Sequence, residues 1–123
     1  MRRLLIATAA MSAVVLVGRF SMAAEESVTG VLIDQTCGAK QMSKDDPEKA
    51  ASSHTKACAT KDSCAESGYA VISGKKMWKF DEKGNKLAKD YFANHDHTKV
   101  VVKGNERGDT LQVTSIAEAP ADK

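Results

Sequence analysis

The chain is short of aromatic residues, of proline and of cysteine. Its 123 residues include one Trp, two Tyr, three Phe, two Pro and three Cys. So few large side chains exclude an extensive core, and a chain of this length forms one small domain at most. Neither a C-x-x-C nor a C-x-x-C-H motif is present, which argues against a thioredoxin-like redox site and against covalently attached haem.

The first 23 residues have the pattern of a secretory signal peptide. Two arginines open the segment, an uncharged apolar run extends over residues 4–17, and the small residues Ser21 and Ala23 offer a cleavage point. We therefore predict a signal peptide at 1–23, a single domain at 24–123, and export to the periplasm or the extracellular space. The apolar run is short for a spanning helix, so no stable membrane span is expected after cleavage.

The predicted mature chain is nearly balanced in charge. The whole chain has 18 basic and 16 acidic residues, for a formal net charge of +2. Cleavage after residue 23 removes three arginines from the 18 basic residues, which leaves 15 and changes the formal charge to −1. A balanced domain has no polybasic surface for nucleic acid, so we expect no nucleic-acid partner.

Alternating apolar patterns predict five strands interrupted by two helical segments. The predicted strands are 28–34, 69–73, 76–81, 99–103 and 110–117, and the predicted helices are 47–60 and 86–93. This is the element order of the OB-fold. We therefore predict a mainly β domain, a small five-stranded OB-like barrel, with a helical insertion at 35–68 between strands one and two and a short helix between strands three and four. An α+β meander with the same elements is the alternative. Trp78 and Phe80 alternate with Met77 and Lys79 and are expected to face the core.

The longer helix is predicted from its first residues. Proline is favoured at the first helical position, and Asp46 before Pro47 can cap the free amides. Ala50, His54 and Cys58 then follow at intervals of four residues, so a continuous helix would present them on one face.

Four stretches of the chain carry a resemblance to other sequences. They are VTGVLIDQTCG, HTKAC followed by another cysteine, SGYAVISGKKMWKFD and KVVVKGNERGDTLQVTSI. Together they cover nearly all of 28–117 and resemble a family of small exported bacterial proteins of unknown function. The last stretch also resembles the closing hairpin of periplasmic bacterial OB-fold proteins. In similar sequences the second and third cysteines lie one helical turn apart, whereas here five residues separate Cys58 from Cys64.

The three cysteines allow one disulfide and leave one thiol. A disulfide is favoured in an oxidising compartment. Cys37 follows the first strand and Cys64 precedes the second, so pairing of those strands would bring both cysteines to the base of the insertion. Cys37–Cys64 is therefore the first choice, Cys37–Cys58 the second and Cys58–Cys64 the third. With a disulfide, no cofactor is expected.

Metal binding is the alternative. Thiolate and imidazole ligands suit zinc or copper. A Cys₃His set is available from Cys37, His54, Cys58 and Cys64. His95 and His97 are a secondary metal candidate, because alternate residues of an extended chain point the same way. A polar turn before the fourth strand is the competing interpretation of that loop.

The resemblance, together with the absence of a recognisable catalytic set, implies a non-enzymatic function. We expect an exported binding module or envelope accessory protein whose partner is a small ligand or an envelope protein. One alternative is a zinc or copper protein with the Cys₃His set. Another is a thiol-dependent enzyme or redox protein with Cys58 as nucleophile and His54 as base. No third orienting group is evident in the sequence, which disfavours catalysis.

Overall fold

The computed structural model of the protein describes residues 25–120, and the signal peptide predicted at 1–23 lies outside them. The described part is a small mixed α/β protein, with about 39% strand and 36% helix. The prediction of a mainly β domain was therefore wrong, because helices occupy almost as much of the chain as strands. The strands are β1 (Glu26–Asp34), β2 (Tyr69–Ser73), β3 (Lys76–Phe80), β4 (Lys99–Arg107) and β5 (Thr110–Glu118). The helices are α1 (Gln35–Gln41), α2 (Pro47–Ser52), α3 (Lys56–Ala59), α4 (Asp62–Glu66) and α5 (Glu82–Asn94).

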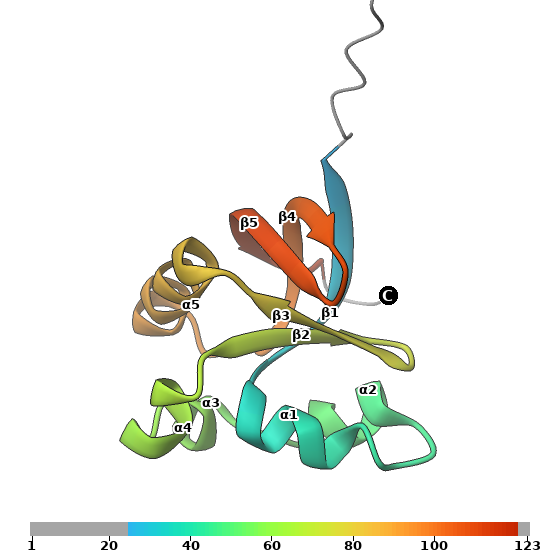
Figure 1. The fold of residues 1–123 in the computed structure, drawn as a ribbon. Coiled ribbons are helices and arrows are strands. Elements are labelled where there is room, and N and C mark those ends of the chain that lie inside the picture. The colour runs from blue at the N-terminus through green and yellow to red at the C-terminus, as the bar shows by residue number, and fades with distance from the viewer. Residues whose placement is uncertain (1–24, 121–123) are drawn as a thin grey trace, which may run out of the picture.

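The five strands form one sheet in the order β1-β2-β3-β5-β4, which closes on itself because β1 also pairs with β4 (Figure 1). The β3–β5 pairing is parallel and the other four pairings are antiparallel. The predicted order of five strands, a helical segment after the first and a helix after the third is confirmed.

β1 changes partner at its centre. Residues 26–31 pair with β4, and residues 31–34 pair with β2. Gly30 lies next to this change, where a Cβ would collide with the carbonyl oxygen of Ile72. Glycine therefore lets two backbones approach closely at the point where the strand bends between its partners.

Alternation along β1 and β2 separates two apolar clusters. The main core combines inward residues of the strands with Ala88, Tyr91 and Phe92 of α5. The smaller cluster comprises Val31, Ile33 and Ile72 on the opposite faces of β1 and β2, together with Ala51 of α2. Phe80 is buried in the main core and Trp78 packs against it, as predicted.

The prediction of one continuous helix at 47–60 was wrong, because the segment forms two short helices with a break at 53–55. The start was right, since Asp46 Oδ1 accepts a hydrogen bond from the Lys49 amide. The Ser53 hydroxyl donates to the Ala50 carbonyl, which competes with continued helix. Thr55 then caps a new helix. As a consequence, the predicted common face of Ala50, His54 and Cys58 does not form.

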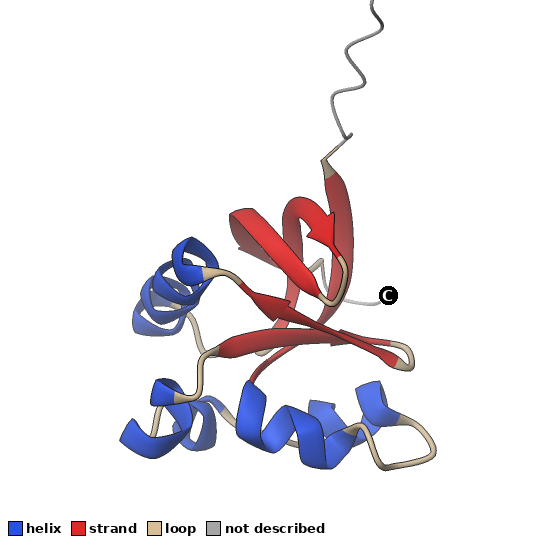
Figure 2. Cartoon of the chain, viewed as in Figure 1, coloured by secondary structure: helices blue, strands red, loops and turns tan. Residues whose placement is uncertain are grey.

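Helices α1 and α4 complete the insertion, and neither was predicted. Figure 2 shows the four short helices α1–α4 grouped beneath β2, with α5 standing apart from them. α5 is longer than the helix predicted at 86–93, because Asp81 caps it and accepts from the Gly84 amide at 2.9 Å. None of the helices within residues 25–120 is both long and apolar enough to cross a membrane.

Candidate metal centre

Asp34 is the residue on which the site is built. It is the last residue of β1 and is fully buried. One carboxylate oxygen, Oδ2, accepts a hydrogen bond of 2.9 Å from the Cys37 amide and so caps α1. The other, Oδ1, lies 3.0 Å from Nε2 of His54. Both oxygens therefore have partners, which offsets the cost of burying a charge.

Two thiols lie beside this carboxylate. Potential ligand atoms of Asp34, Cys37 and Cys64 all lie within 4.8 Å of one another. Cys37 lies in the first turn of α1 and Cys64 in α4, and both are partly exposed thiols. We refer to Asp34, Cys37 and Cys64 as the thiol–carboxylate cluster.

Strand pairing brings the two thiols together. Asp34 is opposite Tyr69 in the β1–β2 ladder. The amide of Gln35 donates to the Gly68 carbonyl at 2.9 Å, so the start of α1 is tied to the residue just before β2. The structure thus places Cys37 and Cys64 at the base of the insertion, as the sequence predicted for paired strands.

His54 supports the cluster from the break between α2 and α3. Its side chain is only 10% exposed, and its amide donates to the Ala51 carbonyl at 2.9 Å. His54 also lines an open hollow of about 490 Å³, to which Lys56, Asp96 and His97 contribute. His54 therefore connects the buried carboxylate with a solvent-accessible surface.

The surroundings keep Cys37 protonated. Burial, the charge of Asp34, a hydrogen bond with that carboxylate and the neighbouring Cys64 raise the pKa of Cys37 to about 11, from an ordinary value of 9.0. At neutral pH this thiol is a poor nucleophile, because the thiolate is the reactive form. A divalent cation would reverse this preference, since it supplies the positive charge that the buried carboxylate and a thiolate require.

Cys58 lies outside the thiol–carboxylate cluster. Within residues 25–120, no other group of three or more potential metal ligands lies within the same 4.8 Å limit. Cys58 belongs to α3, and its amide donates to Thr55 Oγ1. The structure therefore brings together Cys37, Cys64 and, through Asp34, His54, but it does not bring Cys58 into the group. His54 Nε2 faces Asp34, which is not the arrangement expected for a base serving Cys58.

His95 and His97, the secondary metal candidate, have separate partners. The His95 ring stacks on Tyr91 at a centroid distance of 4.3 Å, and its Nδ1 lies 3.0 Å from the Tyr91 carbonyl oxygen. His97 is mostly exposed, and its Nε2 lies 3.5 Å from Glu118. These contacts fit a polar turn before β4.

Sequence reasoning missed Asp34, although a signal was present. An aspartate that ends a strand and precedes a helix by one residue is a typical N-cap. The D-x-x-C spacing then puts the cysteine in the first turn, where its amide reaches the carboxylate. What the pattern does not contain is the burial of Asp34, which pairs with Tyr69 of β2 and contacts His54, both of them distant in the sequence.

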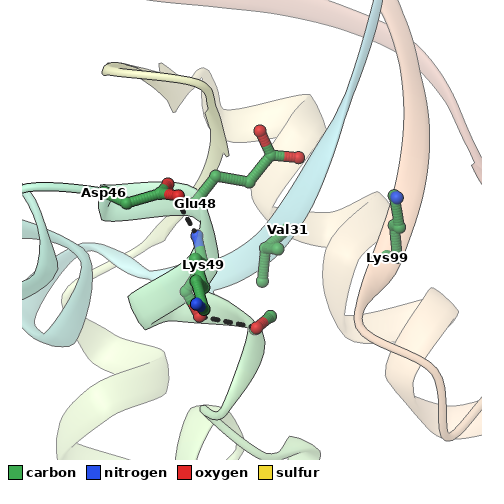
Figure 3. Close-up of a pocket in the computed structure, with 6 residues that line it drawn as sticks. Val31, Asp46, Glu48, Lys49 and Lys99 are labelled. Atoms are coloured by element: carbon green, nitrogen blue, oxygen red, sulfur yellow. Dashed lines mark hydrogen bonds between the residues drawn. The ribbon is translucent and has the colours of Figure 1, made fainter.

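A smaller hollow of about 270 Å³ lies between α2, β1 and β4 (Figure 3). Its polar groups are engaged in local structure. Asp46 accepts a hydrogen bond from the Lys49 amide, and the Ser52 hydroxyl donates one to the Lys49 carbonyl at 2.6 Å. Glu48 accepts a hydrogen bond from the Gly74 amide at 2.7 Å. With neither thiol nor imidazole in its lining, this hollow is a weaker candidate than the thiol–carboxylate cluster.

No protein-family model, curated protein or solved structure matches the chain. The chemistry of Asp34, Cys37 and Cys64 is therefore the basis on which a function can be assigned.

Proposed function

We propose that the protein is an exported, non-enzymatic binding module of OB type that binds a zinc ion at the thiol–carboxylate cluster. The observation that carries this proposal is the mutual approach of the Asp34, Cys37 and Cys64 ligand atoms to within 4.8 Å. The closed five-strand order with a helix after β3 supports the OB type. The signal-peptide pattern of residues 1–23 supports export.

Zinc suits the donor set better than copper(I). Two thiolates are compatible with either metal, whereas a carboxylate oxygen is a ligand for zinc and a poor one for a soft cuprous ion. Zinc is usually four-coordinate, so these three protein ligands leave one position for water or a bound partner molecule. Each oxygen of Asp34 retains a lone pair after its present hydrogen bond, and one of these can be directed at the ion.

His54 has the role of a positioning residue in this proposal. Its ring holds Asp34 at 3.0 Å, and that contact fixes the direction of the carboxylate. Partners of this kind around metal sites are worth about 10–100-fold in affinity. His54 thus contributes to binding through Asp34, without itself contacting the ion.

Zinc titration of the reduced protein tests the proposal. We expect one zinc per chain, measured by competition with a chromogenic chelator and by native mass spectrometry. Cys37→Ser and Cys64→Ser should each weaken binding by about 100-fold or more, because each removes a ligand. Cys58→Ser is the matched control and should bind like the parent protein. Reduced protein that binds no zinc, or equal losses in all three variants, would overturn the proposal.

A second candidate follows from the same two thiols. Cys37 and Cys64 as a disulfide would close the insertion on itself and stabilise the fold by about 3–4 kcal/mol, through a less disordered unfolded chain. The proximity of the two sulfur atoms supports this pairing over the two that involve Cys58. Protein isolated without reductant would then be two hydrogens lighter and would carry one alkylatable thiol, Cys58. Three alkylatable thiols in such a preparation would eliminate this candidate.

A further inference from the structure

We propose that Cys37 and Cys64 form a redox switch, in which oxidation of the pair by a low-molecular-weight disulfide releases the bound zinc. This inference rests on the proposed zinc site and adds its regulation. It treats the metal-bound dithiolate and the Cys37–Cys64 disulfide as two states of one site.

The first support is the distance and accessibility of the thiols. Their sulfur atoms are within 4.8 Å, and both side chains are partly exposed, so a small oxidant can reach them. A disulfide bond needs a sulfur–sulfur distance of about 2.05 Å. Closing the gap therefore requires a shift of at most about 3 Å in one of the two helices that carry them.

The second support is the unequal anchoring of those helices. α1 begins at the buried Asp34 cap and buries Gly38 against Met77 and Ile33. α4 has five residues, none of them buried, and its N-cap residue Lys61 makes no side-chain capping hydrogen bond. Few buried contacts mean a low cost of local movement. α4 is thus the element that can carry Cys64 toward Cys37.

The third support is what happens to Asp34 when the metal leaves. A buried carboxylate without partners would strongly disfavour a metal-free state. Here one oxygen of Asp34 still accepts a hydrogen bond from the Cys37 amide, and the other still contacts Nε2 of His54. The disulfide state therefore contains no unpaired buried charge, and oxidation is not opposed by the site.

The exchange balances as a two-electron reaction. The Cys64 thiolate attacks one sulfur of the oxidant RSSR, which forms a Cys64–SR mixed disulfide and releases RS⁻. The Cys37 thiolate then attacks the Cys64 sulfur, forms the internal disulfide and releases the second RS⁻. Two electrons pass from the protein thiolates to the oxidant, two protons from solvent convert RS⁻ to RSH, and zinc leaves with its charge of +2.

Cys64 is the attacking residue because it lies on α4, which has no buried residue and no side-chain cap and can therefore move toward an oxidant. Cys37 lies in the first turn of the anchored helix α1, which suits it to the second, intramolecular step. Cys58, which is outside the cluster, takes no part and can be removed from the experiment.

The test uses full-length mature protein with Cys58→Ser, loaded with one zinc and treated with glutathione disulfide. We expect release of one zinc per chain to a chromogenic chelator, a mass loss of two hydrogens, and full rebinding of zinc after dithiothreitol. The Cys58→Ser, Cys64→Ser double variant should form no internal disulfide. Circular dichroism establishes that this double variant is folded, and Cys58→Ser, Cys64→Ala serves as a second variant if it is not.

Each outcome decides one of the two proposals. Zinc retained after the internal disulfide has formed would overturn the switch alone. A stable glutathione adduct without an internal disulfide, or no reaction while zinc stays bound, would also overturn the switch and leave the zinc site intact. Reduced protein that binds no zinc, but forms the disulfide readily, would overturn the zinc site and with it the switch.

Discussion

Asp34 and Asp81 occupy equivalent positions in two regions of the molecule. Each ends or follows a strand and caps the helix that comes next, α1 for Asp34 and α5 for Asp81. One oxygen of Asp81 accepts two backbone hydrogen bonds, from the Gly84 amide at 2.9 Å and from the Val113 amide at 3.2 Å. Asp34 accepts from one backbone amide and also contacts an imidazole, with two thiols nearby.

The difference separates a structural cap from a candidate functional residue. Asp81 accepts its hydrogen bonds from backbone amides of the first turn of α5 and of β5, and the first of these amides has no partner within its own helix. The cap at Asp34 would be complete with the Cys37 amide alone. Its additional contact with His54 and its burial beside Cys64 are more than a helix end requires, and they bring together side chains that bind metals.

The largest expected effect is on the free energy of unfolding. It is seen by comparing substitutions at the three helix-capping residues Asp34, Asp81 and Asp46. Asp34→Ala should lower the free energy of unfolding by about 3 kcal/mol, because two donors lose a buried charged acceptor. Asp81→Ala should cost about 2 kcal/mol, and Asp46→Ala, an exposed cap, about 1 kcal/mol. Denaturant unfolding of the reduced, metal-free variants measures all three. If Asp34→Ala cost no more than Asp46→Ala, the contact with His54 would contribute nothing to folding.

Asparagine substitutions separate capping from metal binding. Asparagine caps helices well but is a much weaker zinc ligand than a carboxylate. Asp34→Asn should therefore weaken zinc binding by about 10–100-fold, as measured by chelator competition. Asp81→Asn is the matched control, and its zinc affinity should equal that of the parent protein. Similar losses in both variants would mean that the effect is transmitted through the fold rather than through the ligand.

The role of His54 can be resolved with two replacements. His54→Ala should reduce zinc affinity by about tenfold, because Asp34 loses the donor that directs it. His54→Gln should recover part of that loss, since the glutamine amide can donate to the same oxygen. Chelator competition measures both, and His95→Ala controls for the loss of an imidazole elsewhere. A failure of His54→Gln to exceed His54→Ala, with both variants folded, would contradict a positioning role through Asp34.

The smallest effect concerns alkaline pH. The pKa of Cys37 is about 11 in the folded protein, against an ordinary value of 9.0, so the folded state holds its proton to higher pH than the unfolded state. The resulting stabilisation is present below pH 9 and is lost as the pH rises from 9 to 11. Because the thiol is partly solvated, we expect a loss of about 1 kcal/mol rather than the full value for such a shift.

Urea unfolding of reduced, metal-free protein at several values between pH 8 and pH 11 measures this loss. Burial also raises the pKa of Tyr69 and Tyr91, so part of the decline at high pH comes from these phenols. The comparison of Cys37→Ser with Cys58→Ser isolates the contribution of Cys37. A decline of equal size in both variants would show that Cys37 does not contribute.

Several local features were predictable from the sequence. The start of α2 at Asp46-Pro47 was predicted correctly because capping depends on residues three positions apart. The inward orientation of Phe80 followed from alternation along a strand. The approach of Cys37 to Cys64 followed from one further assumption, that the flanking strands pair, which the β1–β2 ladder confirms.

The errors in the insertion have a common physical cause. Residues 47–60 have reasonable helix propensity, but hydroxyl side chains such as Ser53 compete with the helix and Thr55 offers a new cap. Packing then favours the broken helix. In the observed structure, Ala51 packs within the smaller apolar cluster and the break places His54 against Asp34.

The sequence by itself determined the order of strands and helical segments, the residues that face the core, and the presence of cysteines at both ends of the insertion. These depend on alternation, capping and turn preferences, which act over a few residues. Only the tertiary structure decided that Asp34 is buried, that His54 contacts it, and that Cys58 is left outside. Those outcomes depend on groups that are distant in the chain, such as His54 and Asp34, which are 20 residues apart. The packing of β1, β2 and the short helices sets the geometry between such groups.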